Sequence, residues 1–399
     1  MIPALAPEPR WLVVAALGSA QTIGWASSYY LPAVLARPMA AAVGLEPVAV
    51  FAAFSAALGI SALIGPWAGA RIDRLGGRGL LTASNLVFAT GLAVLAAAPG
   101  PAVMAAGWLI LGIGMGIGLY EAGFATLAGI YGAAARAPIT GITLIAGFAS
   151  TIGWPLSAAM LAEWGWRGAC LGWAAIHLGV ALPLNACLPP MRAAARGAAT
   201  APVSPAAAAT PAGVPPPAPR ALWLVALALA AAWFNTTAMA AHLPGLLQAA
   251  GASSVAAISA GALIGPAQVA ARLMEFGLMR RIHPLNSARL ATAAHPLAAL
   301  ALLALGAPAA HLFAAVHGAG SGILTIAKGT LPLALFGPAG YGRRLGWLNA
   351  PARIMQAVAP LGFGAALAAW GADAIWLTAA SGVLGLVALM ALPRRPGAG

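Results

Sequence analysis

Ala62-Leu63-Ile64-Gly65-Pro66 recurs two hundred residues later as Ala262-Leu263-Ile264-Gly265-Pro266. Each copy lies near the end of an apolar stretch and leads into a segment that carries arginines. Because the chain has 399 residues, a repeat at this distance divides it into two parts of similar length. The repeat therefore predicts two related halves.

The composition excludes a soluble domain with a polar exterior. The chain is 62% hydrophobic and 7% charged, and its mean hydropathy is +0.91. A bilayer core about 30 Å thick needs roughly 20 apolar residues per helix. We therefore predict an all-α membrane protein with twelve transmembrane helices, at approximately 11–36, 47–70, 79–98, 102–131, 139–161, 168–189, 221–248, 255–278, 287–306, 309–336, 346–370 and 374–392.

The arginine positions predict the orientation of these spans. A net charge of +13 is compatible with nucleic acid as a partner, but most arginines fall in alternate loops, where a positive-inside bias places them in the cytoplasm. We expect no nucleic-acid partner, a multi-pass protein of the inner (plasma) membrane, and both termini in the cytoplasm. The arginines on the predicted inner side are Arg10, Arg71, Arg74, Arg78, Arg136, Arg192, Arg196, Arg220, Arg280, Arg281, Arg289, Arg343, Arg344, Arg394 and Arg395.

A proline-rich segment separates the two predicted halves. Residues 192–220 are rich in Ala, Thr, Ser and Pro, and such a segment cannot bury enough surface to fold. We predict an N-terminal six-helix bundle over 1–191, a cytoplasmic linker over 192–220 and a C-terminal six-helix bundle over 221–399. Weaker echoes at an offset of about 205 residues, such as Trp164-Gly165 with Trp370-Gly371, indicate that the bundles are pseudo-symmetric.

The loop after the second span carries the motif that identifies a family. Gly69-Ala-Arg-Ile-Asp73-Arg74-Leu-Gly76-Gly-Arg78 resembles the G-x-x-x-D-R-x-G-R-R signature of the major facilitator superfamily, with Gly77 in place of one basic residue. The resemblance covers essentially the whole chain and implies a transporter of twelve helices. It also implies a gating role for Gly69, Asp73, Arg74, Gly76 and Arg78; the alternative is a merely solvated basic loop.

Two further motifs narrow the resemblance. The eighth span contains Gln268-Val-Ala-Ala-Arg272, which is similar to monocarboxylate porters, although those carry an acid where this chain has Gln268. Drug antiporters of the superfamily carry G-x-x-x-G-P-x-x-G-G in the fifth span, whereas this chain reads Gly147-Phe-Ala-Ser-Thr-Ile-Gly153-Trp-Pro155. The resemblance is thus to an organic-anion or monocarboxylate porter of the bacterial kind.

Cations inside the predicted spans are the first candidates for substrate contact, because a charge in the bilayer is costly and survives mainly beside a cavity or a partner. Lys328 is the only lysine in the chain, and the resemblance places its helix, the tenth, at the central cavity. The alternative is a lysine that snorkels toward the inner face. Arg272 and Arg353 could also grip an anion, or they could pair within and between helices, Arg272 with Glu275.

Glu121 and His317 are the candidates for proton coupling. A carboxyl or an imidazole in an apolar span can exchange a proton near neutral pH. Alternatively, Glu121 pairs with a cavity cation such as Lys328 or is structural, and His317 is a packing residue. Six further polar side chains on the expected cavity helices are substrate candidates, although such groups often bond to their own helix: Gln21, Tyr29, Tyr120, Asn235, Thr236 and Thr325.

Taken together, these patterns predict a secondary transporter that moves a small organic anion, monocarboxylate-like, by proton-coupled alternating access. Three intramembrane cations against two acids, Glu121 and Glu275, favour an anion. The alternatives are proton-coupled efflux of a lipophilic drug-like compound and a non-transporting membrane sensor. We expect no enzyme activity, no cofactor and no metal, because no nucleophile-base set, nucleotide motif or metal-ligand spacing is recognisable. The expected partners are the substrate, protons and lipid, and we expect a monomer.

Overall fold

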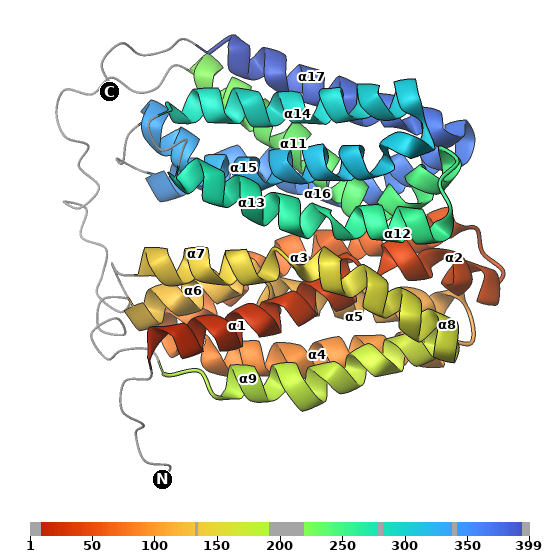
Figure 1. Ribbon diagram of the computed structural model, residues 1–399. Coiled ribbons are helices and arrows are strands. Elements are labelled where there is room, and N and C mark those ends of the chain that lie inside the picture. Colours follow the sequence, from red (N-terminus) through yellow and green to blue (C-terminus); the bar gives the residue numbers. More distant parts are fainter. Residues whose placement is uncertain (1–8, 132–134, 191–218, 278–281, 337–340, 393–399) are drawn as a thin grey trace. The chain divides into compact units, whose positions relative to one another are not determined.

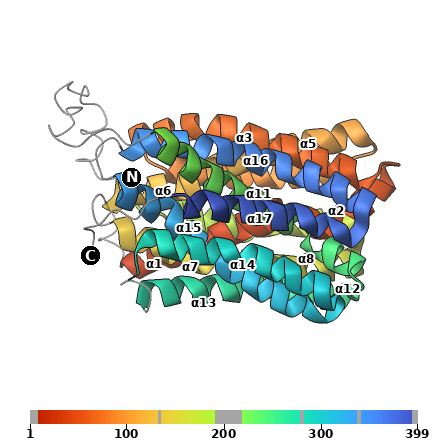
Figure 2. The ribbon, with the colours of Figure 1, turned by 90° about the horizontal axis from the view of Figure 1, so that it is seen from above.

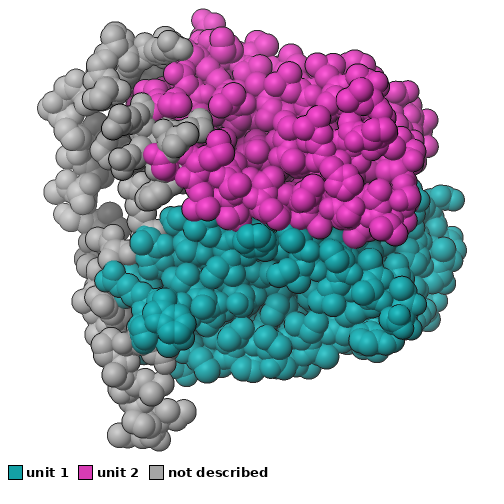
Figure 3. All heavy atoms as spheres, in the orientation of Figure 1, with its two compact units in different colours: residues 1–202 teal, residues 203–399 magenta. Residues whose placement is uncertain are grey.

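The computed structural model describes residues 9–131, 135–190, 219–277, 282–336 and 341–392, and helices account for almost all of them (Figure 1). No strand occurs within these ranges. The chain divides into two compact units, residues 1–202 and 203–399, coloured separately in Figure 3. The predicted linker falls almost entirely outside the described residues, so its boundaries stay a prediction. Six of the arginines on the predicted inner side also lie outside the described residues: Arg192, Arg196, Arg280, Arg281, Arg394 and Arg395. The structure likewise does not describe the side chains of Arg136, Arg343 and Arg344.

The first unit contains long helices that pack side by side (Figures 1 and 2). In chain order they are α1 (Arg10–Gly24), the π-helix η1 (Trp25–Tyr29), α2 (Pro32–Ala42), α3 (Pro47–Leu75), α4 (Arg78–Ala97), α5 (Pro101–Gly118), α6 (Tyr120–Tyr131), α7 (Arg136–Ala146), α8 (Ala149–Ile176), the π-helix η3 (His177–Ala181) and α9 (Leu182–Ala186).

The second unit repeats this arrangement with fewer interruptions. Its elements are α11 (Pro219–Ala249), α12 (Ser254–Ala262), α13 (Ile264–Gly277), α14 (Pro284–Leu305), the short 3-10 helix η6 (Ala307–Ala309), α15 (Ala310–Phe336), α16 (Tyr341–Trp370), the 3-10 helix η7 (Gly371–Ala374) and α17 (Ile375–Met390).

Within the described residues, nine stretches are long and apolar enough to cross a bilayer. Two of them, Ala137–Ala186 and Leu348–Met390, have 50 and 43 residues, which is twice the length of one span. The chain turns inside each stretch at a glycine with positive φ, Gly165 at 68° and Gly371 at 57°. Residues that have a Cβ atom rarely adopt this backbone conformation. With the interrupted first segment, Arg10–Ala42, these stretches correspond to the twelve predicted spans.

An alternating row of glycines on α5 fixes the packing of the first unit. A Cβ at Gly112 would come within 2.8 Å of the backbone of Ala57 on α3, and one at Gly114 within 2.9 Å of the Phe88 ring on α4. Gly116 faces α3 again, where a Cβ would lie 3.1 Å from Ile64 Cβ. The glycines therefore let α5 approach two helices at once, which is how membrane helices gain packing energy.

The same row recurs on α15, 206 residues later. A Cβ at Gly318 would lie 2.9 Å from the carbonyl of Ile264 on α13, and one at Gly320 would lie 2.7 Å from that of Ala291 on α14. Gly322 returns to α13, 2.6 Å from the carbonyl of Gln268. The two units therefore repeat one packing scheme.

This offset corrects the interpretation of the repeated phrase. The two copies of Ala-Leu-Ile-Gly-Pro are 200 residues apart, whereas the packing repeats at 206, so the copies lie about 9 Å apart along equivalent helices. Their settings differ as well, because the first copy lies within the continuous α3, and the second spans the break between α12 and α13 at Leu263. The duplication is real, but the phrase is out of register with it.

The loop motif joins α3 to α4 in a tight turn. Asp73, Arg74 and Arg78 are exposed, and Gly76 has a φ of 84°. Gly77 is buried, and a Cβ there would collide with the side chain of Thr126 on α6. The departure from the signature at this position therefore has a steric cause, since no larger residue fits while Thr126 is present.

Gly77→Ala should destabilise the protein by about 1–3 kcal/mol, because a new methyl group would overpack against a rigid β-branched side chain. The backbone at Gly77, with φ −86° and ψ −19°, accepts alanine, so space alone is the cause. The measurement is thermal unfolding of the purified protein. Thr126→Gly should recover most of the loss in a double-mutant cycle, and Gly79→Ala, where nothing lies within 4 Å, is the control. Equal losses for Gly77→Ala and Gly79→Ala would contradict the steric account.

Candidate functional site

A row of polar side chains follows one stripe of α15. His317, Ser321, Thr325 and Lys328 are spaced by four, four and three residues, which places them on one face of the helix. The Thr325 hydroxyl donates to the carbonyl of Ser321 at 2.8 Å. Since α15 is otherwise mostly apolar, this stripe is the polar face of the helix.

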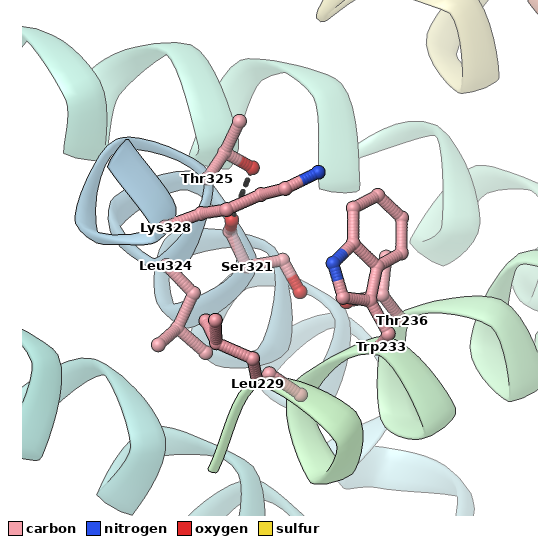
Figure 4. Close-up of a pocket in the computed structure, with 8 residues that line it drawn as sticks. Leu229, Trp233, Thr236, Ser321, Leu324, Thr325 and Lys328 are labelled. Carbon is pink, nitrogen blue, oxygen red and sulfur yellow. Dashed lines mark hydrogen bonds between the residues drawn. The ribbon is translucent and has the colours of Figure 1, made fainter. Parts of the chain in front are cut away.

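The C-terminal part of this stripe, Ser321, Thr325 and Lys328, lines a pocket between α15 and α11 (Figure 4). The pocket holds about 320 Å³ of empty space, including the space at its open side. Lys328 crosses it, and its ammonium lies 4.8 Å from the centre of the Trp233 ring, within the range of a cation–π contact. Lys328 is the one charged residue among the eight that line the pocket: Leu229, Ala232, Trp233, Thr236, Ser321, Leu324, Thr325 and Lys328.

A second cation lies beside the pocket. Arg272 on α13 is 6% exposed, and its Nη2 lies 3.4 Å from Gln268 Oε1 and 3.4 Å from Thr325 Oγ1. Glu275 is half-buried, and its Oε2 has no hydrogen-bond partner within the described residues. The guanidinium therefore extends toward the polar stripe of α15 and does not pair with Glu275 on its own helix.

The predicted residues of the first unit lie on α1, η1 and α6. The Gln21 amide is 1% exposed and donates to the carbonyl of Gly118 at 2.7 Å, where the chain leaves the helical conformation between α5 and α6. Glu121 is exposed in the first turn of α6, where the helix dipole favours a negative charge.

Aromatic rings form a cluster beside this helix break. Trp25 lies 4.9 Å from both Tyr29 and Tyr120, measured between ring centres, and Tyr120 stacks on Phe124 at 5.3 Å. Tyr29 is 2% exposed, whereas Trp25, Tyr120 and Phe124 are half-buried. The cluster is therefore partly exposed at the surface of its own unit.

Three predicted residues of the second unit have different surroundings. Thr236 lines the pocket with Lys328. Asn235 is fully buried and donates to the carbonyl of Thr378 on α17 at 3.1 Å, so its amide joins two helices. Arg353 is half-buried on α16 and is not among the residues that line the pocket.

His317 has a partner that sequence reasoning missed. Its Nδ1 lies 3.0 Å from Nδ1 of His295 on α14, and its Nε2 lies 3.5 Å from the Ser321 hydroxyl. His295 and His317 are 3% and 4% exposed. Because the two residues belong to different helices, no sequence spacing links them, and only the packing of α14 on α15 brings them together.

A second buried histidine was also missed, in the first unit. His177 Nε2 lies 2.7 Å from the Ser27 hydroxyl, and its Nδ1 lies 2.9 Å from Asn85 Oδ1. The Asn85 amide donates to the carbonyl of Leu81, so Oδ1 faces the ring and the Nδ1–H tautomer fits. Ser27 and His177 both lie in π-helical turns, η1 and η3. This network connects three helices and is closed to solvent.

Chemically, the α11–α15 pocket suits an anion. One ammonium crosses it, three hydroxyl groups line it, and a guanidinium lies next to one of them. Charge-assisted hydrogen bonds from such donors are about twice as strong as neutral ones. Within the described residues no group of three or more metal-ligating side chains occurs.

Comparison with known proteins identifies the fold. A variant of the nucleoside transporter NupG matches with a TM-score of 0.73 and 16% identity, over 96% of this chain and 99% of that one. The human organic anion transporter MFSD10 (TETRAN) matches with a TM-score of 0.63 and 18% identity, over 96% and 99%. No protein-family model and no curated protein sequence matches this chain.

At these identities the likeness establishes the fold and nothing finer. The chain is an all-α, multi-pass membrane protein with twelve transmembrane helices in two six-helix bundles, as predicted. This is the fold of major facilitator superfamily transporters. Both solved structures are transporters and neither is an enzyme.

His177→Ala should cost about 2–4 kcal/mol of stability, because it leaves a cavity and deprives Ser27 and Asn85 of their buried partner. Thermal or denaturant unfolding of the purified protein measures this. His311→Ala is the matched control, since His311 is exposed and contacts Ser259 at 3.1 Å; its loss should stay within about 0.5 kcal/mol. Equal losses of stability in the two variants would show that the His177 network does not stabilise the protein.

Proposed function

We propose that this protein is a secondary transporter that moves a small organic anion across the membrane by alternating access. The observation that carries the proposal is the Lys328 ammonium, which crosses a pocket that three hydroxyl groups also line. A charged group within a span is functional by default, because its desolvation must be offset. The fold supports the transport step and the pocket supports the substrate class.

The pocket residues have complementary roles in this proposal. Lys328 supplies a point charge for a carboxylate, and the hydroxyls of Thr236 and Ser321 donate hydrogen bonds to its oxygens. The Thr325 hydroxyl keeps its hydrogen bond to the Ser321 carbonyl. Trp233 provides an apolar face for the carbon skeleton beside the ammonium. Arg272 donates a hydrogen bond to the Thr325 hydroxyl and makes the electrostatic potential beside the pocket more positive. A monocarboxylate fits this set, because one charge and a short apolar body are what the lining offers.

The remaining predicted residues enter the proposal as parts of the transport cycle. Asp73, Arg74 and Arg78 act in the loop between α3 and α4 as a gate, and Glu121 and His317 as proton carriers. Gln21, Tyr29, Tyr120, Asn235 and Arg353 are proposed to meet substrate at other stages of the cycle. A monomer in the inner membrane, with both termini in the cytoplasm, is the arrangement that we propose.

A nucleoside is the second candidate substrate. The aromatic cluster of Trp25, Tyr120 and Phe124 favours it, because half-buried aromatic rings can stack on a planar base. The likeness to NupG, a nucleoside transporter, agrees with this alternative. Adenosine therefore belongs in the same binding screen as the carboxylates.

Lys328→Ala should weaken binding of lactate and benzoate by about 10–100-fold, since a hydrogen bond to a charged group contributes about 1.5–3 kcal/mol. Binding is measured by isothermal titration to the purified protein, and uptake is measured in proteoliposomes. Arg37→Ala, which removes an exposed cation on α2, is the control and should bind like the wild type.

Three results would overturn the anion proposal. The first is equal carboxylate binding by the wild type and Lys328→Ala. The second is adenosine binding without carboxylate binding. The third is export of a lipophilic cation such as ethidium that Lys328→Ala leaves unchanged, which would favour drug efflux. Binding of a carboxylate without any flux in proteoliposomes would instead favour a sensor.

A further inference from the structure

The His295–His317 pair is a buried group that the anion pocket does not itself use. His295 lies at the middle of α14, ten residues from its last residue, and His317 lies seven residues into α15. Both imidazoles are almost completely buried. Ionisable side chains inside membrane helices are energetically costly, and where they occur they often mark functional sites. Two such rings in direct contact are therefore a candidate site.

The helices close tightly around the pair. A Cβ at Gly320 on α15 would lie 3.6 Å from His295 Cε1, and one at Gly382 on α17 would lie 3.3 Å from His295 Cβ. Phe313 stacks on His317 at 5.8 Å with an interplanar angle of 9°. The packing therefore holds the two rings against each other at their Nδ1 atoms, and the Ser321 hydroxyl is the other hydrogen-bond partner of His317 within the described residues.

The 3.0 Å contact fixes the number of protons between the rings. One Nδ1 donates and the other accepts, so the neutral pair holds two ring protons, one of them shared. If His295 donates from Nδ1, its Nε2 is a bare lone pair, and this atom has no hydrogen-bond partner within the described residues. A third proton can bind at this Nε2 without breaking the shared bond.

A fourth proton cannot be accommodated. Both Nδ1 atoms would then carry hydrogen, and two donors would face each other at 3.0 Å. The singly charged pair, in contrast, keeps its hydrogen bond and converts it to a charge-assisted one. We therefore propose that His295 and His317 together form a binding site for one proton, which serves as the coupling ion of transport.

The pair is connected to the anion pocket through Ser321. The Ser321 hydroxyl contacts His317 Nε2 at 3.5 Å and also lines the pocket. Lys328 lies eleven residues beyond His317, about 16 Å along the helix axis. A carboxylate held between Ser321 and Lys328 would lie on the pair's side of Lys328, and its negative charge would offset the cost of an imidazolium. This coupling step rests on the proposed anion function, whereas the one-proton site does not.

The other charged and titratable side chains described on the surrounding helices bond to other groups or lie at other positions along their helices. His242 bonds to the carbonyl of Pro360, and Arg289 bonds to carbonyls at the end of α17. Arg272 lies at the level of Thr325, eight residues beyond His317, and Glu275 lies almost one turn further along α13. Arg353 lies on α16, and the elements α12 and α17 carry no charged residue. Within the described residues, each ring of the pair has the other as its titratable contact.

The direct test counts protons on the pair. Full-length protein with ¹⁵N-labelled histidine in lipid nanodiscs is followed by NMR between pH 8 and pH 5. We expect a scalar coupling across the Nδ1–Nδ1 hydrogen bond and uptake of one proton shared by both rings, as one macroscopic step. Two independent titrations, two protons, or no protonation of either ring in this range would overturn the proposal.

Substitution tests the coupling to the anion. In the wild type, affinity for lactate or benzoate should rise as the pH falls, by at most tenfold per pH unit, which is the limit for uptake of one proton. His295→Gln and His317→Gln should each abolish this pH dependence, and His311→Gln should leave it intact. An unchanged pH dependence in both Gln variants would show that the proton binds elsewhere.

The two proposals can fail separately. Lys328→Ala should lose carboxylate affinity while the histidine pair still takes up one proton in the NMR titration. If neither lactate nor benzoate binds to the wild type, the anion proposal fails and the proton count still decides the histidine proposal. If His295→Gln does not fold, His317→Gln and the wild-type proton count remain as tests.

Discussion

The close approach of α5 and α15 to their neighbours is the constraint on which the rest of the structure depends. In a bilayer, apolar side chains gain nothing by leaving lipid for protein, so helices associate through tight packing. Gly112, Gly114 and Gly116 on α5 face α3 and α4 in alternation, and Gly318, Gly320 and Gly322 on α15 face α13 and α14. Each row brings three helices together where a single Cβ would separate them.

The functional groups are placed by the same rows. His317 and Ser321 directly precede Gly318 and Gly322 in the sequence, so the glycines that draw α15 onto α13 also set the depth of the polar stripe. Gly320 admits α14, which brings His295 to His317. The pocket with Lys328 and the proposed proton site thus lie on one helix, one above the other. A ligand and a proton on the same rigid element are well placed to influence each other's binding.

The first unit uses its polar groups differently within the described residues. Gln21 donates to the Gly118 carbonyl at the break between α5 and α6. The hydrogen bonds among Ser27, His177 and Asn85 connect three helices at two π-helical turns. Irregular backbone inside a membrane is tolerated where side chains re-satisfy its polar groups. Polar side chains that the sequence offers for substrate contact therefore partly hold the backbone, whereas Trp25, Tyr120 and Phe124 are half-buried.

The sequence by itself determined the fold class, the spans and the existence of two halves, because hydropathy over about 20 residues and the demand for internal backbone bonding leave no other solution. It also singled out Lys328, since a lone lysine in a span is conspicuous. Only the tertiary structure decided that the halves repeat at 206 residues, that Thr126 requires glycine at position 77, and that Arg272 faces Thr325. It also joined His295 to His317 and His177 to Ser27. These contacts arise from the rotation and depth of packed helices, which local sequence spacing does not encode.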